Sequence, residues 1–197
     1  TRVVSAGNRL EDVGAFVSKQ SPALNNRMIH IEFQSDFSDW KEWAIKNRMH
    51  PMVMGYLQWK QGEGLHRFKE DVDTDAFPTP RSWAFLGLPD GILNLGIDNG
   101  ILAEAVKGTI GQGEGLEFMG YWKLYKSLPD PKDILLKGKD IIPKEGNVMF
   151  ALCASLVHLV RDHQDKINRL VEYSMKVEKE FSVVLIKDML KTDMKDK

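Results

Sequence analysis

The chain has 197 residues, of which 43% are hydrophobic and 28% are charged, and a chain of this length can bury a substantial core. Its formal net charge of −1 gives no overall bias toward nucleic acid or anionic lipid. The single cysteine, Cys153, excludes an internal disulfide framework, and the longest apolar run, Val148 to Val160, is too short to span a bilayer. We therefore expect a cytoplasmic protein with no membrane partner.

The first residues predict a short strand that ends in a polar loop. Val3 and Val4 are β-branched, and the small and turn-forming residues Ser5 to Asn8 follow them. A strand this short needs neighbouring strands, and the chain begins with Thr1 rather than methionine. We therefore expect a piece of a larger domain. A second strand is predicted over residues 29–33, where apolar and polar residues alternate.

Beyond Asp36 the pattern predicts helices almost throughout, so the expected fold class is mainly α. Ser21 and Pro22 predict a short helix before the second strand, as N-cap and first helical residue. The four glycines between residues 108 and 115 predict a flexible turn, and residues 129–144 predict an exposed loop. The other helices are expected to start after Ser38, at Pro51 and at Pro80, and to span about residues 93–110, 116–127, 148–163 and 164–190.

Two polar residues near the N-terminus are candidates for a ligand site. Asn8 follows the carboxyl end of the first predicted strand, where open α/β sheets place their ligand-binding residues. Asparagine also commonly starts a turn, and that simpler role remains open. Arg27 follows the short helix, and its planar guanidinium suits phosphoryl oxygens across a subunit boundary. The alternative for Arg27 is an ordinary solvated charge.

Arg81 is a third candidate, because Pro78 and Pro80 fix the direction from which the chain enters its helix. A cation near a helix N-terminus opposes the helix macrodipole, so helix stability does not explain this arginine. The local alternative is a salt bridge to Asp71, Asp73 or Asp75.

Taken in order, three segments resemble the second half of a MoxR-like AAA+ ATPase: Ser5-Ala-Gly-Asn8, Pro22-Ala-Leu-Asn-Asn-Arg27 and Thr79-Pro-Arg81. The resemblance covers about residues 1–90 and extends more weakly to about residue 160. It implies the end of an α/β AAA+ core over residues 1–35 and a helical lid over residues 36–197. It also implies that Asn8 is sensor 1, Arg27 is the arginine finger and Arg81 is sensor 2.

The resemblance implies ATP and Mg²⁺ as cofactors, other copies of the chain as partners in a ring, and a client protein that the full-length ATPase remodels. Met28 departs from the family, which has phenylalanine after the finger arginine. The Walker A and Walker B segments, which hold the phosphates and Mg²⁺, are absent from these 197 residues. In the family they precede the point where this chain begins, so we expect the chain alone not to hydrolyse ATP.

Other classes of protein find less support. The glycine-rich segment 108–115 neither follows a strand nor precedes Lys-Ser/Thr, which favours a turn over a phosphate loop. The five histidines lack metal-ligand spacing, and Cys153 lies on an apolar helix face typical of a core residue. Neutral charge disfavours a helix-turn-helix DNA binder. The alternative that remains is a noncatalytic helical scaffold, in which the chain is complete and Arg27 and Arg81 are ordinary surface residues.

Overall fold

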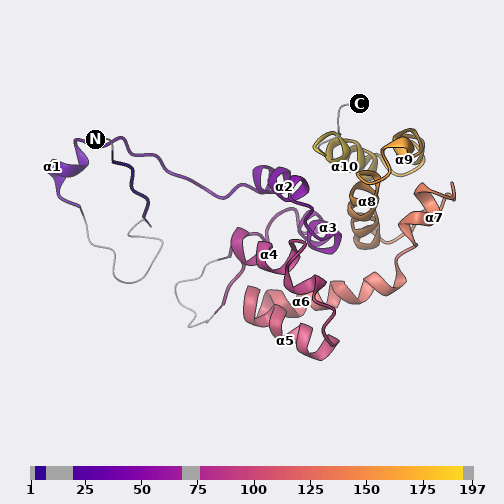
Figure 1. The fold of residues 1–197 in the computed structure, drawn as a ribbon, viewed down its shortest axis with the longest axis horizontal. Helices are drawn as coiled ribbons and strands as arrows, with labels where there is room; N and C mark the ends of the chain where they lie inside the picture. Colours follow the sequence, from indigo (N-terminus) through magenta and orange to yellow (C-terminus); the bar gives the residue numbers. More distant parts are fainter. Residues whose placement is uncertain (1–2, 8–19, 68–75, 193–197) are drawn as a thin grey trace. The chain divides into compact units, whose positions relative to one another are not determined.

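The computed structural model describes residues 3–7, 20–67 and 76–192, and these residues form α-helices joined by loops and short 3₁₀ turns (Figure 1). The prediction of a mainly α fold is confirmed. No strand occurs among the residues described. The chain divides into two units, one of residues 1–34 with 68–73 and the other of residues 35–67 with 74–197.

The first unit contains the predicted short helix, α1 (Pro22–Asn25). Ser21 caps it by accepting a hydrogen bond at Oγ from the backbone N–H of Leu24, at 3.3 Å. The strands predicted at Val3–Val4 and over residues 29–33 are wrong for this structure, because both segments have no regular secondary structure. Alternating residues form a strand only when a neighbouring strand supplies hydrogen-bond partners. Here Ile29 and Phe33 are each 91% exposed.

The second unit is entirely helical in its described part (Figure 1). Its elements are α2 (Phe37–Lys46), α3 (Pro51–Trp59), α4 (Pro80–Gly87), η1 (Ile92–Asn94), α5 (Asn99–Ile110), α6 (Gln112–Trp122), η2 (Lys123–Ser127), α7 (Pro131–Leu135), α8 (Gly146–Val160), η3 (Gln164–Lys166), α9 (Ile167–Ser174) and α10 (Lys179–Leu190).

Three of the expected helix starts can be compared directly with the caps. The starts of α3 at Pro51 and α4 at Pro80 are confirmed, with His50 and Thr79 as their N-caps. The start of α2 is two residues earlier than predicted, because Asp36 rather than Ser38 is the cap. The Asp36 carboxylate accepts a hydrogen bond from the backbone N–H of Asp39 at 3.0 Å. Its negative charge also stabilises the helix, because it lies near the positive end of the helix dipole.

Three other predictions are corrected. The glycine-rich segment 108–115 is not a flexible turn, since α5 runs to Ile110 and α6 begins at Gln112, with only Gly111 between them at φ 85°. The supposed exposed loop 129–144 contains α7, whose Ile134 and Leu135 are buried. In place of the single helix expected over residues 164–190, the structure has three elements: η3, α9 and α10. The break between α9 and α10 lets both helices pack against α8.

Helix α8 lies between two hydrophobic clusters. Ala151 belongs to the cluster formed by α2 to α6, whereas Leu152, Cys153 and Leu156 belong to the cluster formed with α7, α9 and α10. Cys153 is fully buried, so its predicted core position is confirmed. The contact between α3 and α8 is close at Gly55, where an added Cβ would lie 2.8 Å from the Cα of Ala151.

We expect Gly55→Ala to lower the free energy of unfolding by about 1–3 kcal/mol, because the new methyl group has no room between α3 and α8. Gly108→Ala is the matched control, since a Cβ at this helical position meets no atom within 4 Å. The control should stabilise the protein by about 0.5–1 kcal/mol through reduced backbone entropy of the unfolded chain. Urea denaturation measures both, and equal effects of the two substitutions would contradict the close packing.

Candidate functional site

The start of α4 is built by reciprocal hydrogen bonds between Thr79 and Ser82. Thr79 Oγ1 accepts from the Ser82 backbone N–H at 3.0 Å, and the Thr79 backbone N–H donates to Ser82 Oγ at 2.7 Å. Pro80 occupies the first helical position, where its fixed φ suits the helix. The first turn of α4 is therefore fixed locally, as the sequence predicted.

Tertiary contacts hold the same turn on the core of the second unit. The buried Trp83 donates its indole N–H to the carbonyl oxygen of Gly64 at 2.9 Å. Trp40 of α2 donates its indole N–H to the carbonyl oxygen of Pro80 at 3.3 Å. The backbone N–H of Arg67 donates to the carbonyl of Pro78 at 3.1 Å. Contacts on both sides of Arg81 thus anchor its backbone.

The side chain of Arg81 is exposed on this anchored turn and forms no hydrogen bond or ion pair with another residue in the described ranges. Its proposed partners Asp71, Asp73 and Asp75 lie outside those ranges. Pro80 has no N–H and the Ser82 N–H is donated to Thr79, so the backbone N–H of Arg81 and its guanidinium are the donors that this turn can offer an anion. The turn, whose backbone is anchored, can therefore present the Arg81 cation to a phosphate or carboxylate.

Of the other two predicted site residues, the structure describes only Arg27. Arg27 is exposed in the first unit and donates from Nη1 to the carbonyl oxygen of Ala23 at 2.9 Å, across the end of α1. Asn8 lies outside the described residues. The structure thus describes two of the three predicted residues, in separate units, and the roles of all three remain predictions.

A buried carboxylate network lies beside the anchored turn, and the sequence did not indicate it. The hydroxyl of Tyr56 on α3 donates to Glu114 on α6 at 2.7 Å, and Arg67 Nη1 contacts the other carboxylate oxygen at 3.2 Å. Burial, with the hydrogen bond to Glu114 as a further cause, raises the pKa of the Tyr56 hydroxyl. The network joins α3 to α6 and holds the segment that carries Gly64, so it supports α4.

A second buried charge pair joins α2 to α10. Lys41 Nζ lies 2.7 Å from Asp188 Oδ1, both side chains are 10% exposed, and Lys41 also donates to Gln58 of α3. Burial lowers the pKa of Lys41 and raises the pKa of Asp188, while their mutual attraction opposes both shifts. The pair ties the C-terminal helix to the two helices that precede the site.

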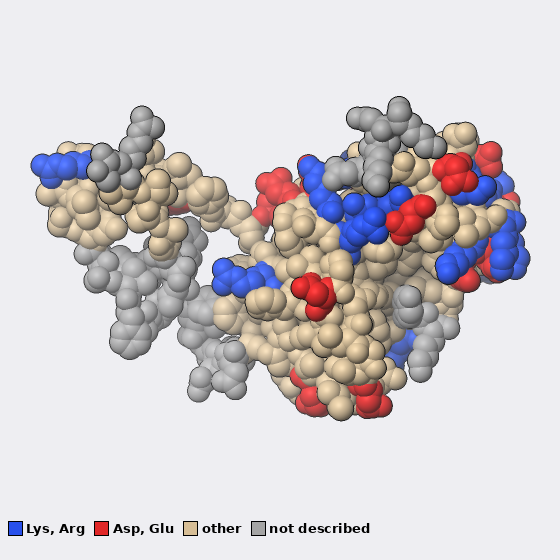
Figure 2. Space-filling view, in the orientation of Figure 1, with Lys and Arg blue, Asp and Glu red and all other residues tan. Residues whose placement is uncertain are grey.

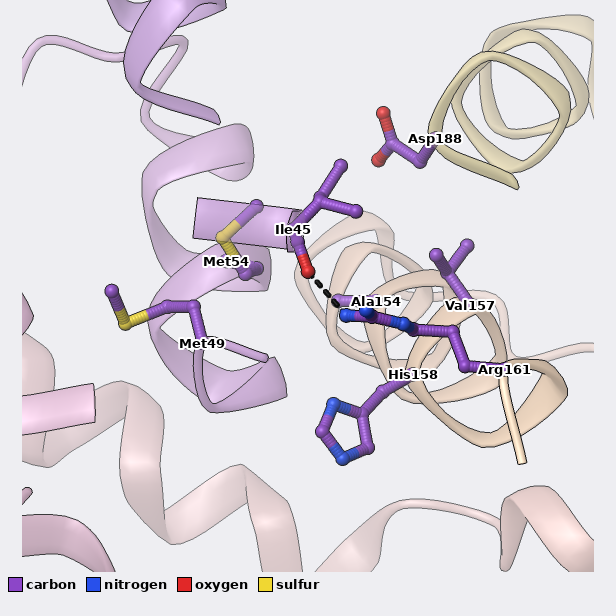
Figure 3. A pocket seen from close by; sticks show the side chains of 8 residues that line it. All are labelled: Ile45, Met49, Met54, Ala154, Val157, His158, Arg161 and Asp188. Atoms are coloured by element: carbon purple, nitrogen blue, oxygen red, sulfur yellow. Dashed lines mark hydrogen bonds between the residues drawn. The ribbon is translucent and has the colours of Figure 1, made fainter. Parts of the chain in front are cut away.

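A hollow of about 30 Å³ lies next to this pair, with Arg161 and His158 at one side and Asp188 at another (Figure 3). The guanidinium of Arg161 donates to the carbonyl oxygen of Ile45, at the end of α2 (Figure 3). The guanidinium therefore supplies a donor and a positive charge to the C-terminal end of α2. Because the hollow has room for about one water molecule, it does not suit a larger ligand.

His50 combines a structural hydrogen bond with a titratable ring. Its Nδ1 accepts the backbone N–H of Met52 at 3.1 Å, and its ring lies 5.4 Å from that of Trp122. Burial, with a smaller repulsion from His158, lowers the pKa of His50 to about 4. An imidazole that caps α3 through a lone pair must be neutral, so protonation removes the cap.

No family model, curated protein or solved structure matches the chain. Within residues 3–7, 20–67 and 76–192, no three His, Cys, Asp or Glu residues lie where they could hold a metal ion. No helix in the same ranges is long and apolar enough to cross a membrane. Basic and acidic side chains are interspersed on the face of the second unit shown in Figure 2. The candidate site therefore rests on the geometry around Arg81.

We expect His50→Asn, which keeps a capping side chain, to reduce the loss of stability in acid. The unfolded histidine titrates near its ordinary pKa of 6.5 and the folded one near about 4, so the unfolded chain binds the extra proton between these values. The contribution of His50 to the free energy of unfolding is therefore fully present above pH 6.5, and about 3 kcal/mol of it is lost as the pH falls to 4. Urea denaturation at pH 7 and pH 4 tests this, and identical losses in both proteins would contradict it.

We expect Lys41→Met to lower the free energy of unfolding by about 3–5 kcal/mol, because it leaves the Asp188 carboxylate buried without its partner. Adding Asp188→Leu should recover most of the loss. Lys46→Met, on the same helix but in an exposed pair with Glu42, should change stability by about 0.5 kcal/mol or less. Thermal denaturation of the three variants compares them, and no recovery in the double variant would count against the pair.

Proposed function

We propose that this chain is the second half of a MoxR-like AAA+ ATPase, comprising the end of its nucleotide-binding core and its helical lid. The full-length protein would couple ATP hydrolysis to the remodelling of a partner protein. The observation that carries this proposal is the anchored first turn of α4, which presents the exposed Arg81. A helical second unit with its own two core clusters is also what a lid requires.

In this proposal Arg81 contacts the phosphates of the nucleotide bound by its own subunit. An anion at the start of α4 relieves the unfavourable placement of a cation near the positive end of the helix dipole. Since Trp83, Trp40 and Arg67 anchor the backbone around Arg81, a force on its guanidinium moves the second unit as a whole. Arg81 would thus couple the state of the nucleotide to the orientation of the lid.

The remaining roles come from the resemblance. Arg27 would reach the nucleotide of a neighbouring copy in a ring, and Asn8 would position the attacking water or the γ-phosphate. Arg81 fits the phosphates of ATP, whereas the residues described contain no carboxylate cluster for Mg²⁺. The resemblance assigns the ligands of the metal to the Walker segments.

The second candidate is a noncatalytic helical interaction protein, favoured by the well-packed helical second unit. It requires no role for Arg27 or Arg81. The two candidates predict different effects of replacing Arg27 or Arg81 by alanine. A scaffold should keep its partner binding, whereas the ATPase should lose turnover.

We expect the complete gene product to hydrolyse ATP, and Arg81→Ala to lower its turnover about 100-fold, because a cation at the transferring phosphoryl group is lost. Arg27→Ala should lower turnover by at least as much, because the cation supplied to the neighbouring copy is lost. Arg48→Ala is the control, since this arginine is half-exposed and already pairs with Asp162. Phosphate release at saturating ATP and Mg²⁺ measures turnover.

Unchanged turnover in Arg81→Ala would contradict the role of Arg81. Absence of hydrolysis by the complete protein would contradict the ATPase itself. A circular dichroism spectrum of each variant checks that its helices are intact.

A further inference from the structure

An open hollow of about 390 Å³ lies between the end of α3, the second half of α6 and the start of α8. This volume lies at the lower end of the range for small-ligand clefts. It is separate from Arg81 and belongs entirely to the second unit. Its lining consists of Trp59, Glu117, Gly120, Tyr121, Leu124 and Asn147.

The aromatic wall of the hollow is held in place. Trp59 stacks on Tyr121 with ring centroids 5.7 Å apart and an interplanar angle of 16°, which covers one side of the indole. Tyr121 is buried and donates its hydroxyl to the backbone carbonyl of Asn147 at 3.1 Å. Trp59 nevertheless remains 42% exposed. A large, oriented indole surface is thus available to a ligand in the hollow.

Glu117 is the only charged residue among the described residues that line the hollow. Its Oε2 accepts a hydrogen bond from Lys60 and lies 3.4 Å from the Tyr56 hydroxyl, whose proton is donated to Glu114, whereas its Oε1 bonds to no other residue in the described ranges. The side chain is 53% exposed, and the hydrogen bond from Lys60 is the main cause that holds the pKa of the Glu117 carboxyl below its usual range. The carboxylate is therefore ionised at neutral pH and can accept a further donor.

Gly120 lines the hollow between these groups. A Cβ at Gly120 would meet no atom within 4 Å, so a larger side chain there would extend into the hollow without a clash. The indole surface attracts a cation, and the carboxylate attracts a planar group with several N–H donors. Among the described residues that line the hollow there is no cation for a phosphate group, and the neighbouring Lys60 already pairs with Glu117 Oε2.

We propose that this hollow binds the guanidinium of an arginine side chain presented by a partner protein, with the indole of Trp59 against its plane and Glu117 Oε1 accepting its N–H groups. Guanidinium is the side-chain cation that both stacks on an aromatic surface and bonds to a carboxylate through a planar fork. This surface goes beyond the proposed ATPase, and its test does not depend on nucleotide.

The experiment is a titration of the ¹⁵N-labelled chain, followed at the indole N–H signal of Trp59, which the variant Trp59→Phe identifies. The probe is N-acetylarginine amide, and its neutral isostere N-acetylcitrulline amide is the ligand control. Gly120→Leu fills the hollow, and Gly113→Leu is the matched control, since a Cβ at that α6 position is also free of contacts. Thermal denaturation of both leucine variants confirms that they fold.

We expect the arginine probe to shift the Trp59 signal saturably, and citrulline to bind about tenfold more weakly or not at all. Gly120→Leu should abolish the shift and Gly113→Leu should preserve it. Equal binding of citrulline, a stronger shift with adenosine, or a response unaffected by Gly120→Leu would overturn the proposal. Tighter binding of free L-arginine than of the capped residue would assign the hollow to the amino acid instead of a protein.

Discussion

The close approach of α3 and α8 is the constraint on which the second unit depends. Only a glycine at position 55 lets the Tyr121 hydroxyl and the backbone of Ala151 pack directly against α3. With α8 fixed there, one of its faces completes the cluster of α2 to α6 and the other completes the cluster of α7, α9 and α10. Two cores thus share one helix, and a change at this contact affects both.

The proposed functional surfaces inherit their rigidity from this contact. Helix α3 carries Tyr56, whose hydroxyl bonds the buried Glu114, and the chain after α3 supplies the carbonyl of Gly64 to Trp83 of α4. The same helix ends at Trp59, which stacks on Tyr121 beside the hollow. Both the backbone that carries Arg81 and the aromatic wall of the hollow are thus tied to α3.

Local sequence signals predicted what depends on local chemistry. The proline and threonine before Arg81 predicted the start of α4, and the spacing of apolar residues predicted a helical fold, since caps and periodicity act within a few residues. Long-range contacts were missed. Glu114 lies in a segment that its glycines marked as a turn, yet it pairs with Tyr56, 58 positions away. The predicted strand at residues 29–33 failed because a strand also needs a partner.

The most direct test of the ATPase account is the coding sequence upstream of the codon for Thr1. The account predicts a strand followed by Gly-x-x-x-x-Gly-Lys-Ser/Thr, and then an acidic strand before Thr1, because Arg81 and Arg27 have phosphates to contact only when those segments bind nucleotide. A start codon immediately upstream, with no such segments, would contradict the account. The chain would then be a helical binding module, and the roles proposed for Asn8, Arg27 and Arg81 would be wrong.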